Sequence, residues 1–449
     1  MLQRRPTRQV SVGSEKTGIV RIGGGLPDRH ARATTPAPVS VQTMTTSYTH
    51  EVDKTVAEIH RLHAAGADLI RLAVPEPRDT AALPEILNQT SVPLVADVHF
   101  HYKRALEAIE AGVHKIRLNP GNINNRKQVE EVIDACKTAN DGQGIPIRVG
   151  VNEGSIIERK DKQKRAKELG AVFGGNKHGY MLAIMIAKLE EYLDIFYDRG
   201  FYDITISAKS MDAALVVDAY NEISKRFDHP LHLGVTHAGP VETGRIRSVA
   251  ALSGLLVHGI GDTLRISYAS DPIYEVEDGL ELLYALGLRT RVGADLIACP
   301  TCGRIQVDLF TLVNQVREKL KAEIRLPIKV AVMGCVVNGP GEAEGADVAV
   351  FAGNKRGIIY VQGEQVANVP EAEILDRLLA ECAEFQRKVQ AGEARLGEKK
   401  VDIVPPDPIG ELGSGWEKMA AERLKTATLT ISGAPTSTPP PADRVPAAT

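Results

Sequence analysis

The sequence predicts an α/β protein in which a (β/α)₈ barrel of the TIM type is followed by a small α+β domain. Short β-like runs alternate with segments of helical periodicity over about 250 residues, which is the usual length of such a barrel. The pattern then changes after Gly293. Of the 449 residues, 43% are hydrophobic, enough to build the cores of two domains.

Residues 1–37 mix basic and glycine-rich stretches, and we expect them to be an N-terminal segment without regular structure. The barrel is expected over residues 38–292, with strands beginning at Val39, Leu69, Pro93, Lys115, Ile147, Asp203, Leu231 and Thr263. Helical segments such as 53–66 and 180–200 lie between these strands. Both end in glycine, which is typical of a left-handed helix C-cap.

The connection from Asn152 to the helix near Tyr180 is longer than the others and rich in charge and glycine. It fits a mobile excursion over the barrel mouth or a solvated helix equally well. Residues 293–397 predict the small domain, with a helix at 307–320, strands at 328–335, 346–353 and 357–363, and a closing helix from Pro370. Residues 398–449 are rich in Pro, Ala, Thr and Ser, and we expect a disordered tail.

Charge and composition exclude several classes of function. The 54 Lys and Arg residues nearly balance the 57 Asp and Glu residues, so no global field attracts nucleic acid or an anionic membrane. No apolar run approaches the roughly 18 residues that would span a bilayer. We therefore expect a cytoplasmic protein. Five cysteines in a chain of this length favour metal, redox or core roles over a disulfide framework.

Polar side chains interrupt the carboxyl ends of several expected strands, where a barrel interior is normally apolar. The residues concerned are Arg71, Asp97, His99, Arg117, Asn119, Arg148, Asn152, Lys209, Arg265 and Ser267. Buried cations without partners are costly, so four arginines and a lysine at one rim predict an anionic ligand, and guanidinium groups suit phosphate. Any one of these arginines could form a surface ion pair, and Asp97 with His99 could be a structural pair. The recurrence across strands favours a phosphate site.

Three cysteines have the spacing of a metal centre. Cys299 and Cys302 form C-P-T-C, and Cys335 follows 33 positions later. A closed zinc site would need a fourth Cys or His, but no histidine follows His258. Three cysteines can hold a [4Fe–4S] cluster that leaves one iron open to an oxygen ligand or a substrate.

Three further residues are of a type that can bind this metal centre: one is a possible ligand, and we expect the other two to be core residues. Glu342 lies seven residues after Cys335, beyond a Gly-Pro-Gly turn, and is a candidate ligand for the open iron. Cys136 and Cys382 lie within helical patterns, where we expect packing roles.

The chain resembles the 4-hydroxy-3-methylbut-2-enyl diphosphate synthase family, in the bacterial type that joins a barrel directly to a cluster domain. The resemblance covers roughly residues 8–390. It is carried by the strings VSVQTMTT, RLAVP, ADVHF, IRLNPGN, IRVGVN, LHLGVT, HGIGDTLRIS, ACPTCGR and GCVVNGPGE. The last two together are highly specific to this family.

The resemblance implies an oxidoreductase of isoprenoid biosynthesis, in the MEP pathway. It would reduce 2-C-methyl-D-erythritol 2,4-cyclodiphosphate by two electrons, open the ring and release water. It also implies a [4Fe–4S] cluster on Cys299, Cys302 and Cys335 with Glu342 on the fourth iron, and a substrate pocket lined by the ten rim residues. Flavodoxin or ferredoxin would supply electrons, and a head-to-tail homodimer would complete the site.

One position departs from the family pattern. The family has GVTEAG where this chain has GVTHAG, so His237 replaces a glutamate that the resemblance implies in acid–base chemistry. Either Glu242, five residues on, takes that role or the imidazole of His237 carries the proton.

Two other classes of protein remain as alternatives. A barrel aldolase or pterin-type synthase with a structural zinc would be colourless. A cluster-bearing scaffold or nucleic-acid binder is disfavoured by the 4% aromatic content and by the lack of a reader motif.

Overall fold

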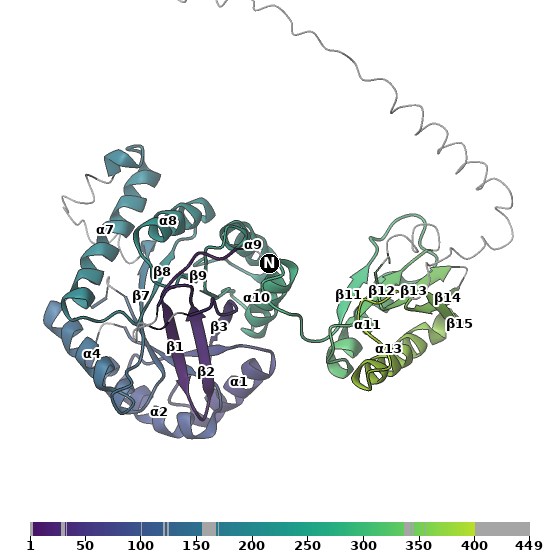
Figure 1. Cartoon of the computed structure of the whole chain (residues 1–449), viewed down its shortest axis with the longest axis horizontal. Helices are drawn as coiled ribbons and strands as arrows, with labels where there is room; N and C mark the ends of the chain where they lie inside the picture. Colours follow the sequence, from purple (N-terminus) through teal and green to yellow (C-terminus); the bar gives the residue numbers. More distant parts are fainter. Residues whose placement is uncertain are drawn as a thin grey trace, which may run out of the picture. The chain divides into compact units, whose positions relative to one another are not determined.

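The chain divides between Thr290 and Arg291 into two compact units. The computed structural model describes residues 3–27, 32, 34–99, 101–119, 122–123, 125–154, 168, 170–335, 343, 345–353 and 355–399. Figure 1 shows a ring of strands and helices in the first unit and a sheet with helices in the second.

The first unit contains a sheet of eight parallel strands rolled into a barrel. The strands are β3 (Ser40–Met44), β4 (Leu69–Ala73), β5 (Leu94–Asp97), β6 (Lys115–Leu118), β7 (Ile147–Asn152), β8 (Ile204–Lys209), β9 (His232–Leu233) and β10 (Thr263–Leu264). Their order is β8-β7-β6-β5-β4-β3-β10-β9, and a parallel bridge between Ile206 and Leu231 joins the two edges. The predicted barrel and its strands are confirmed.

Helices surround the strands and bury their apolar faces against them. They are α1 (Val52–Ala64), α2 (Pro77–Gln89), α3 (Tyr102–Glu110), α4 (Arg126–Thr138), α7 (Lys177–Asp198), α8 (Ala213–Arg226), α9 (Val241–Val257) and α10 (Ile273–Ala285). Local chemistry fixes several ends. The Asp212 carboxylate accepts hydrogen bonds from the amides of Ala214 and Leu215 in the first turn of α8, which is typical N-capping. Gly66 and Gly200 follow α1 and α7 with φ of 105° and 62°. Both therefore have the positive φ that is predicted for glycines at the helix C-caps.

The N-terminal segment is more ordered than predicted. Strands β1 (Gln9–Ser14) and β2 (Gly18–Gly23) form an antiparallel hairpin, whose Val12 packs on Leu69 at the start of β4. Lys16 donates to two carbonyl groups at the end of α2, at 2.8 and 2.6 Å. The hairpin therefore covers the amino-terminal end of the barrel (Figure 1). The prediction was wrong because the hairpin buries its apolar face against residues distant in sequence.

The second unit is a five-stranded mixed sheet in the order β11-β12-β13-β14-β15. Its elements are β11 (Asp295–Ala298), α11 (Leu309–Glu323), β12 (Lys329–Met333), β13 (Val348–Gly353), β14 (Arg356–Val361), β15 (Glu364–Pro370), the 3₁₀ turn η1 (Glu371–Glu373) and α13 (Ile374–Gln390). Sequence reasoning missed β11 and β15. Strand β15 is largely exposed, so it lacks an apolar pattern. Cys136 in the barrel and Cys382 in α13 are fully buried, as predicted for core residues.

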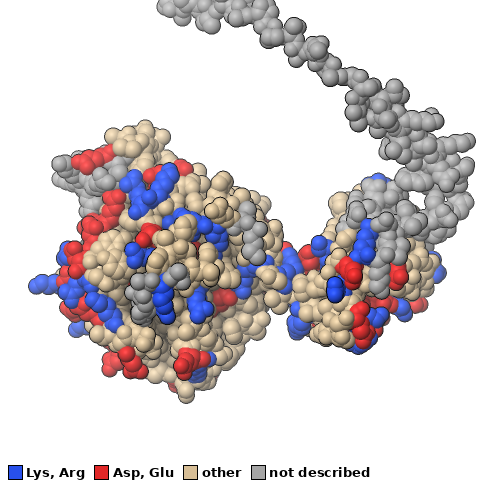
Figure 2. All heavy atoms as spheres, in the orientation of Figure 1, with Lys and Arg blue, Asp and Glu red and all other residues tan. Residues whose placement is uncertain are grey.

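Several predictions fall on residues outside the described ranges. These are most of the connection after Asn152, the loop that contains Glu342, and the tail beyond Lys399. Of the helices described, none is long and apolar enough to cross a membrane. Figure 2 shows both signs of charge interspersed on the visible face of the barrel, which agrees with the nearly balanced composition.

Candidate functional site

Five cations gather toward the carboxyl ends of the barrel strands. Arg71 belongs to β4, Arg117 to β6, Arg148 to β7 and Lys209 to β8, and Arg265 directly follows β10. The sheet register brings Arg148, the second residue of β7, level with Arg117 and with Asp97 at the end of β5. The first four side chains are buried, and Arg265 is mostly buried. The parallel strands therefore gather the predicted cations at one end of the barrel.

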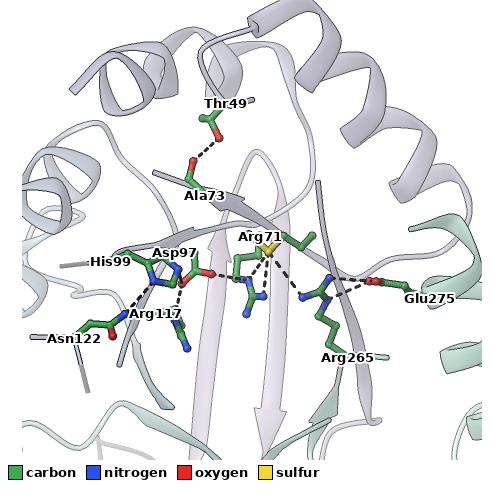
Figure 3. A network of polar contacts seen from close by, with 10 residues as sticks. Thr49, Arg71, Ala73, Asp97, His99, Arg117, Asn122, Arg265 and Glu275 are labelled. Atoms are coloured by element: carbon green, nitrogen blue, oxygen red, sulfur yellow. Dashed lines mark hydrogen bonds and ion pairs between the residues drawn. The ribbon is translucent and has the colours of Figure 1, made fainter. Parts of the chain in front are cut away.

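Asp97 connects three of the predicted side chains (Figure 3). Its carboxylate lies 3.2 Å from Arg71 Nε, 3.0 Å from Arg117 Nη1 and 3.4 Å from His99 Nε2. Burial alone would raise the pKa of Asp97, but the two guanidinium groups and the His99 contact outweigh it and hold the pKa well below its usual value. Asp97 therefore stays ionised and orients both arginines. It belongs to the charged site and not to an isolated pair with His99.

Glu275, which sequence reasoning missed, fixes Arg265 from the opposite side (Figure 3). It is 2% exposed, and its two oxygens accept from Arg265 Nε and Nη2 at 3.1 and 3.2 Å. The same carboxylate accepts from Thr43 Oγ1 at 2.9 Å and from the Tyr268 amide at 3.1 Å. In the sequence Glu275 looks like an ordinary acid in the first turn of a helix, so only the tertiary structure reveals this contact.

Arg148 has donors that no described residue satisfies. The residue is 1% exposed, yet its Nε and Nη1 have no hydrogen-bond partner in the described part of the chain. Burial and the nearby guanidinium groups of Arg71 and Arg117 lower its pKa. Unsatisfied buried donors are costly, and an anion would satisfy these.

Lys209 lies beside the same open donors. Burial, followed by the charge of Arg148, lowers its pKa well below the usual value. Two glycines preserve space here, because a Cβ at Gly150 would lie 2.7 Å from Ser207 Oγ and one at Gly234 would lie 2.7 Å from Lys209 Nζ. Lys209 and the open donors of Arg148 together make this part of the site cationic.

The polar character continues deeper into the barrel than predicted. Lys115 is fully buried and donates to Thr205 Oγ1 at 3.0 Å. His232 is also fully buried, and neither ring nitrogen has a hydrogen-bond partner among the described residues. Burial is the main cause of the lowered pKa of both groups. The available signal for Lys115 was its position two residues before Arg117, which places both side chains on the same strand face.

The remaining predicted residues differ in how closely they join the site. Asn119 is buried after β6 and Asn152 ends β7, while Ser267 donates to the Val235 carbonyl at 2.9 Å. His237 and Glu242 are exposed, in the loop after β9 and in the first turn of α9. Within the described residues, no hydrogen bond or ion pair joins either of them to the five cations. The structure therefore adds no support for their acid–base roles.

The predicted cluster cysteines follow two adjacent strands of the second unit. Cys299 comes directly after β11 and Cys335 soon after β12, and these strands pair in parallel. The Gly334 amide donates to Cys299 Sγ at 3.2 Å. In iron–sulfur proteins, hydrogen bonds to the sulfurs help to set the reduction potential of the cluster. Cys302 is exposed in the intervening turn.

The donor set of this edge fits an iron–sulfur cluster, because it offers three soft thiol ligands. Among the described residues, no three His, Cys, Asp or Glu side chains are close enough to hold one ion. The loop of residues 336–342, with Glu342, lies outside the described ranges. The strand ends thus bring Cys299 and Cys335 to a common edge without forming a complete ligand set.

Comparisons with known proteins match both units. A family described as the GcpE TIM-barrel domain matches residues 29–280, and one described as the GcpE protein C-terminal domain matches residues 295–384. A Bacillus licheniformis protein named 4-hydroxy-3-methylbut-2-en-1-yl diphosphate synthase (flavodoxin) is 44% identical over 394 residues, covering 88% of this chain and 98% of the relative. A Bacillus subtilis protein of the same name is 43% identical over 398 residues, covering 88% and 97%.

Proposed function

The chain belongs to the GcpE family, and from this membership we propose that it is a 4-hydroxy-3-methylbut-2-enyl diphosphate synthase of the MEP pathway. It reduces 2-C-methyl-D-erythritol 2,4-cyclodiphosphate by two electrons, opens the ring and releases water. The observation that carries the substrate assignment is Arg148, whose buried donors lack an acceptor among the described residues. A diphosphate supplies the oxygen acceptors that such donors require.

The barrel binds and orients the diphosphate before any electron arrives. Arg71, Arg117 and Arg265 are held at fixed positions by Asp97 and Glu275, so little reorganisation is needed when charge develops. Arg148 and Lys209 add positive charge beside them, which stabilises the phosphate oxygen that leaves carbon when the ring opens. Asn119, Asn152, His99 and Ser267 complete the proposed lining of the site.

The proposed cofactor is a [4Fe–4S] cluster held by Cys299, Cys302 and Cys335, with Glu342 on the fourth iron. When bound, the cluster supplies single electrons and a Lewis-acidic iron. His237 or Glu242 is the proposed proton carrier. Flavodoxin is the proposed electron donor, since the relatives carry that word in their name; ferredoxin is the alternative donor.

The larger assembly is also part of the proposal. The barrel, with its N-terminal hairpin, forms the substrate domain up to about residue 292, and residues 293–397 form the cluster domain. The protein acts as a cytoplasmic homodimer. Nucleic acid and membrane are not among its partners.

Anaerobic purification, followed by iron and sulfide analysis, tests the cofactor. We expect a brown protein with about four irons per chain and a reduced-state EPR signal that changes on adding the cyclic diphosphate. Cys302→Ser should lose the iron, whereas Cys382→Ala, at a buried cysteine in the core of the same unit, should keep it. A colourless protein with stoichiometric zinc after reconstitution would instead support a barrel synthase with a structural metal.

A further inference from the structure

Met44 lies between two of the site's arginines and contacts both. It ends β3, the strand between β4 and β10. Arg71 Nε and Nη2 donate to Met44 Sδ at 3.2 and 3.1 Å, and Arg265 Nη1 lies 3.9 Å from the same sulfur. Figure 3 labels both arginines, Arg71 and Arg265, which these contacts link through the sulfur. The thioether is thus a shared acceptor for two cations on opposite sides of β3.

Each of the two arginines also contacts a carboxylate. Asp97 binds Arg71 at 3.2 Å, and Glu275 binds Arg265 through both of its oxygens. Glu275 binds Arg265 through nitrogens other than the Nη1 that contacts the sulfur, whereas Nε of Arg71 contacts both Asp97 and Met44. Met44 occupies the space between the two guanidinium groups, where two positive charges would otherwise face each other without any acceptor.

The chemistry of a thioether suits that position. A carboxylate between the arginines would cancel the charge that an anionic ligand needs, whereas a hydrocarbon would leave the donors of buried Arg71 with one acceptor fewer. A thioether is neutral and accepts only weakly. Charged phosphate oxygens accept guanidinium hydrogen bonds more strongly, so they can replace the sulfur as the acceptor.

We propose that Met44 is a positioning residue that spaces Arg71 and Arg265 for a diphosphate, its sulfur accepting their hydrogen bonds until phosphate oxygens replace it. This inference rests on the proposed function, because it takes a diphosphate as the anion. Met44 acts through the two arginines and has no part in electron transfer. Its effect therefore falls on binding and not on the chemical step.

The test compares Met44→Leu, which keeps the volume but removes the acceptor, with Met44→Gln, which restores a neutral acceptor of similar length. In the holoenzyme, Met44→Leu should raise KM for the cyclic diphosphate by about fivefold to twentyfold, with kcat within about threefold of wild type. Met44→Gln should recover most of the loss. Met185→Leu, at a fully buried methionine of α7, should leave both constants unchanged.

A second readout separates this inference from the proposed function. Titration calorimetry with inorganic pyrophosphate should show the same order of affinity: wild type, then Met44→Gln, then Met44→Leu. An unchanged Kd in Met44→Leu overturns the role of Met44, even if wild-type turnover supports the enzyme assignment. If wild type binds pyrophosphate but does not turn over the cyclic diphosphate, the proposed function fails while Met44 is still judged by Kd. If wild type binds neither anion, both proposals fail.

Discussion

Both ends of the barrel contain arginines, but the arginines at the two ends differ in the partners that they contact. At the amino-terminal end, Arg8 pairs with Asp228 at 2.9 Å and Arg4 pairs with buried Asp262. A hollow of about 620 Å³ opens there, and Arg8 lies over the Tyr202 ring at its wall. At the carboxyl end, Asp97 contacts Arg71 and Arg117 and Glu275 contacts Arg265, while among the described residues no ion pair joins Arg148 or Lys209 to either carboxylate. Arg4 and Arg8 thus each contact a carboxylate, whereas the described residues supply no acceptor for Nε and Nη1 of Arg148.

We infer from this difference that an arginine's partners, and not its burial or its position at a strand end, distinguish a structural role from the proposed binding role. It also agrees with the general division of such barrels into a stability face and a catalytic face. Substitutions at the two ends should therefore have opposite consequences for stability and for binding.

The largest expected effect is on binding, at Arg148. Arg148→Met should weaken diphosphate affinity by about a thousandfold, because a buried charged donor set is lost. The free energy of unfolding should stay the same or rise, since the substitution removes a buried charge with open donors. Steady-state kinetics and urea unfolding measure the two quantities. Arg8→Met, which breaks a half-exposed pair, is the control and should change stability by less than about 1 kcal/mol.

The reverse effect is expected at Arg4. Arg4→Met should lower the free energy of unfolding by about 3 kcal/mol, because it leaves the buried Asp262 carboxylate without its cation. KM for the cyclic diphosphate should not change. The double variant Arg4→Met/Asp262→Asn should regain part of the stability in urea unfolding. A large rise in KM in Arg4→Met would contradict the separation of the two ends.

Acid should lower the stability of the fold through its buried histidines, two of which lie toward the amino-terminal end of the barrel. Burial lowers the pKa of His114 and of His229 from 6.5 to about 4, and His114 Nδ1 accepts the Leu94 amide at 3.1 Å. Since the folded pKa lies below the unfolded one, this stability is present above pH 6.5 and is lost as pH falls toward 4. The loss is about 2 kcal/mol for each histidine at pH 5. Urea unfolding at pH 7 and pH 5 measures it.

A His229→Gln variant tests the source of this pH dependence. It should lose less stability than wild type between the two pH values, because His229 is gone while the other buried histidines with lowered pKa, His114 and His232, still titrate. Asp97 should not contribute in this interval, since its depressed pKa keeps it ionised in the folded protein. Identical profiles for the variant and wild type would show that other groups set the acid sensitivity.

The smallest expected effect is on diphosphate affinity, when a methyl group is added beside Lys209. In Gly234→Ala the new Cβ would lie 2.7 Å from Lys209 Nζ and from the Arg265 carbonyl oxygen. The lysine must move, and we expect diphosphate affinity to fall by about fivefold, a net change typical of one displaced hydrogen bond. Gly254→Ala in α9, where no atom lies within 4 Å of the new Cβ, should leave affinity unchanged. Calorimetry with pyrophosphate compares the two variants.

Much of the site could be predicted because strand periodicity is local information. Alternation along β6 and β7 places Arg117 and Arg148 on the inner face, and the carboxyl ends of parallel strands must meet at one end of a barrel. Glu275 and Met44 could not be predicted in this way. Glu275 is an acid in a helix, and Met44 is an apolar residue in a strand. Each contacts an arginine whose position beside it is not apparent from the sequence.

The sequence by itself determined the barrel, the polar rim and the cysteine motif. Each is recognised from a local pattern: the length of the strand–helix repeat, the alternation of side chains along a strand, and the spacing of the cysteines. Only the tertiary structure decided which charges are paired. Arg4 meets Asp262, and Arg265 meets Met44, across more than 200 residues of sequence. The N-terminal hairpin is ordered for the same reason, since its apolar face is buried against residues of the barrel that are distant in sequence.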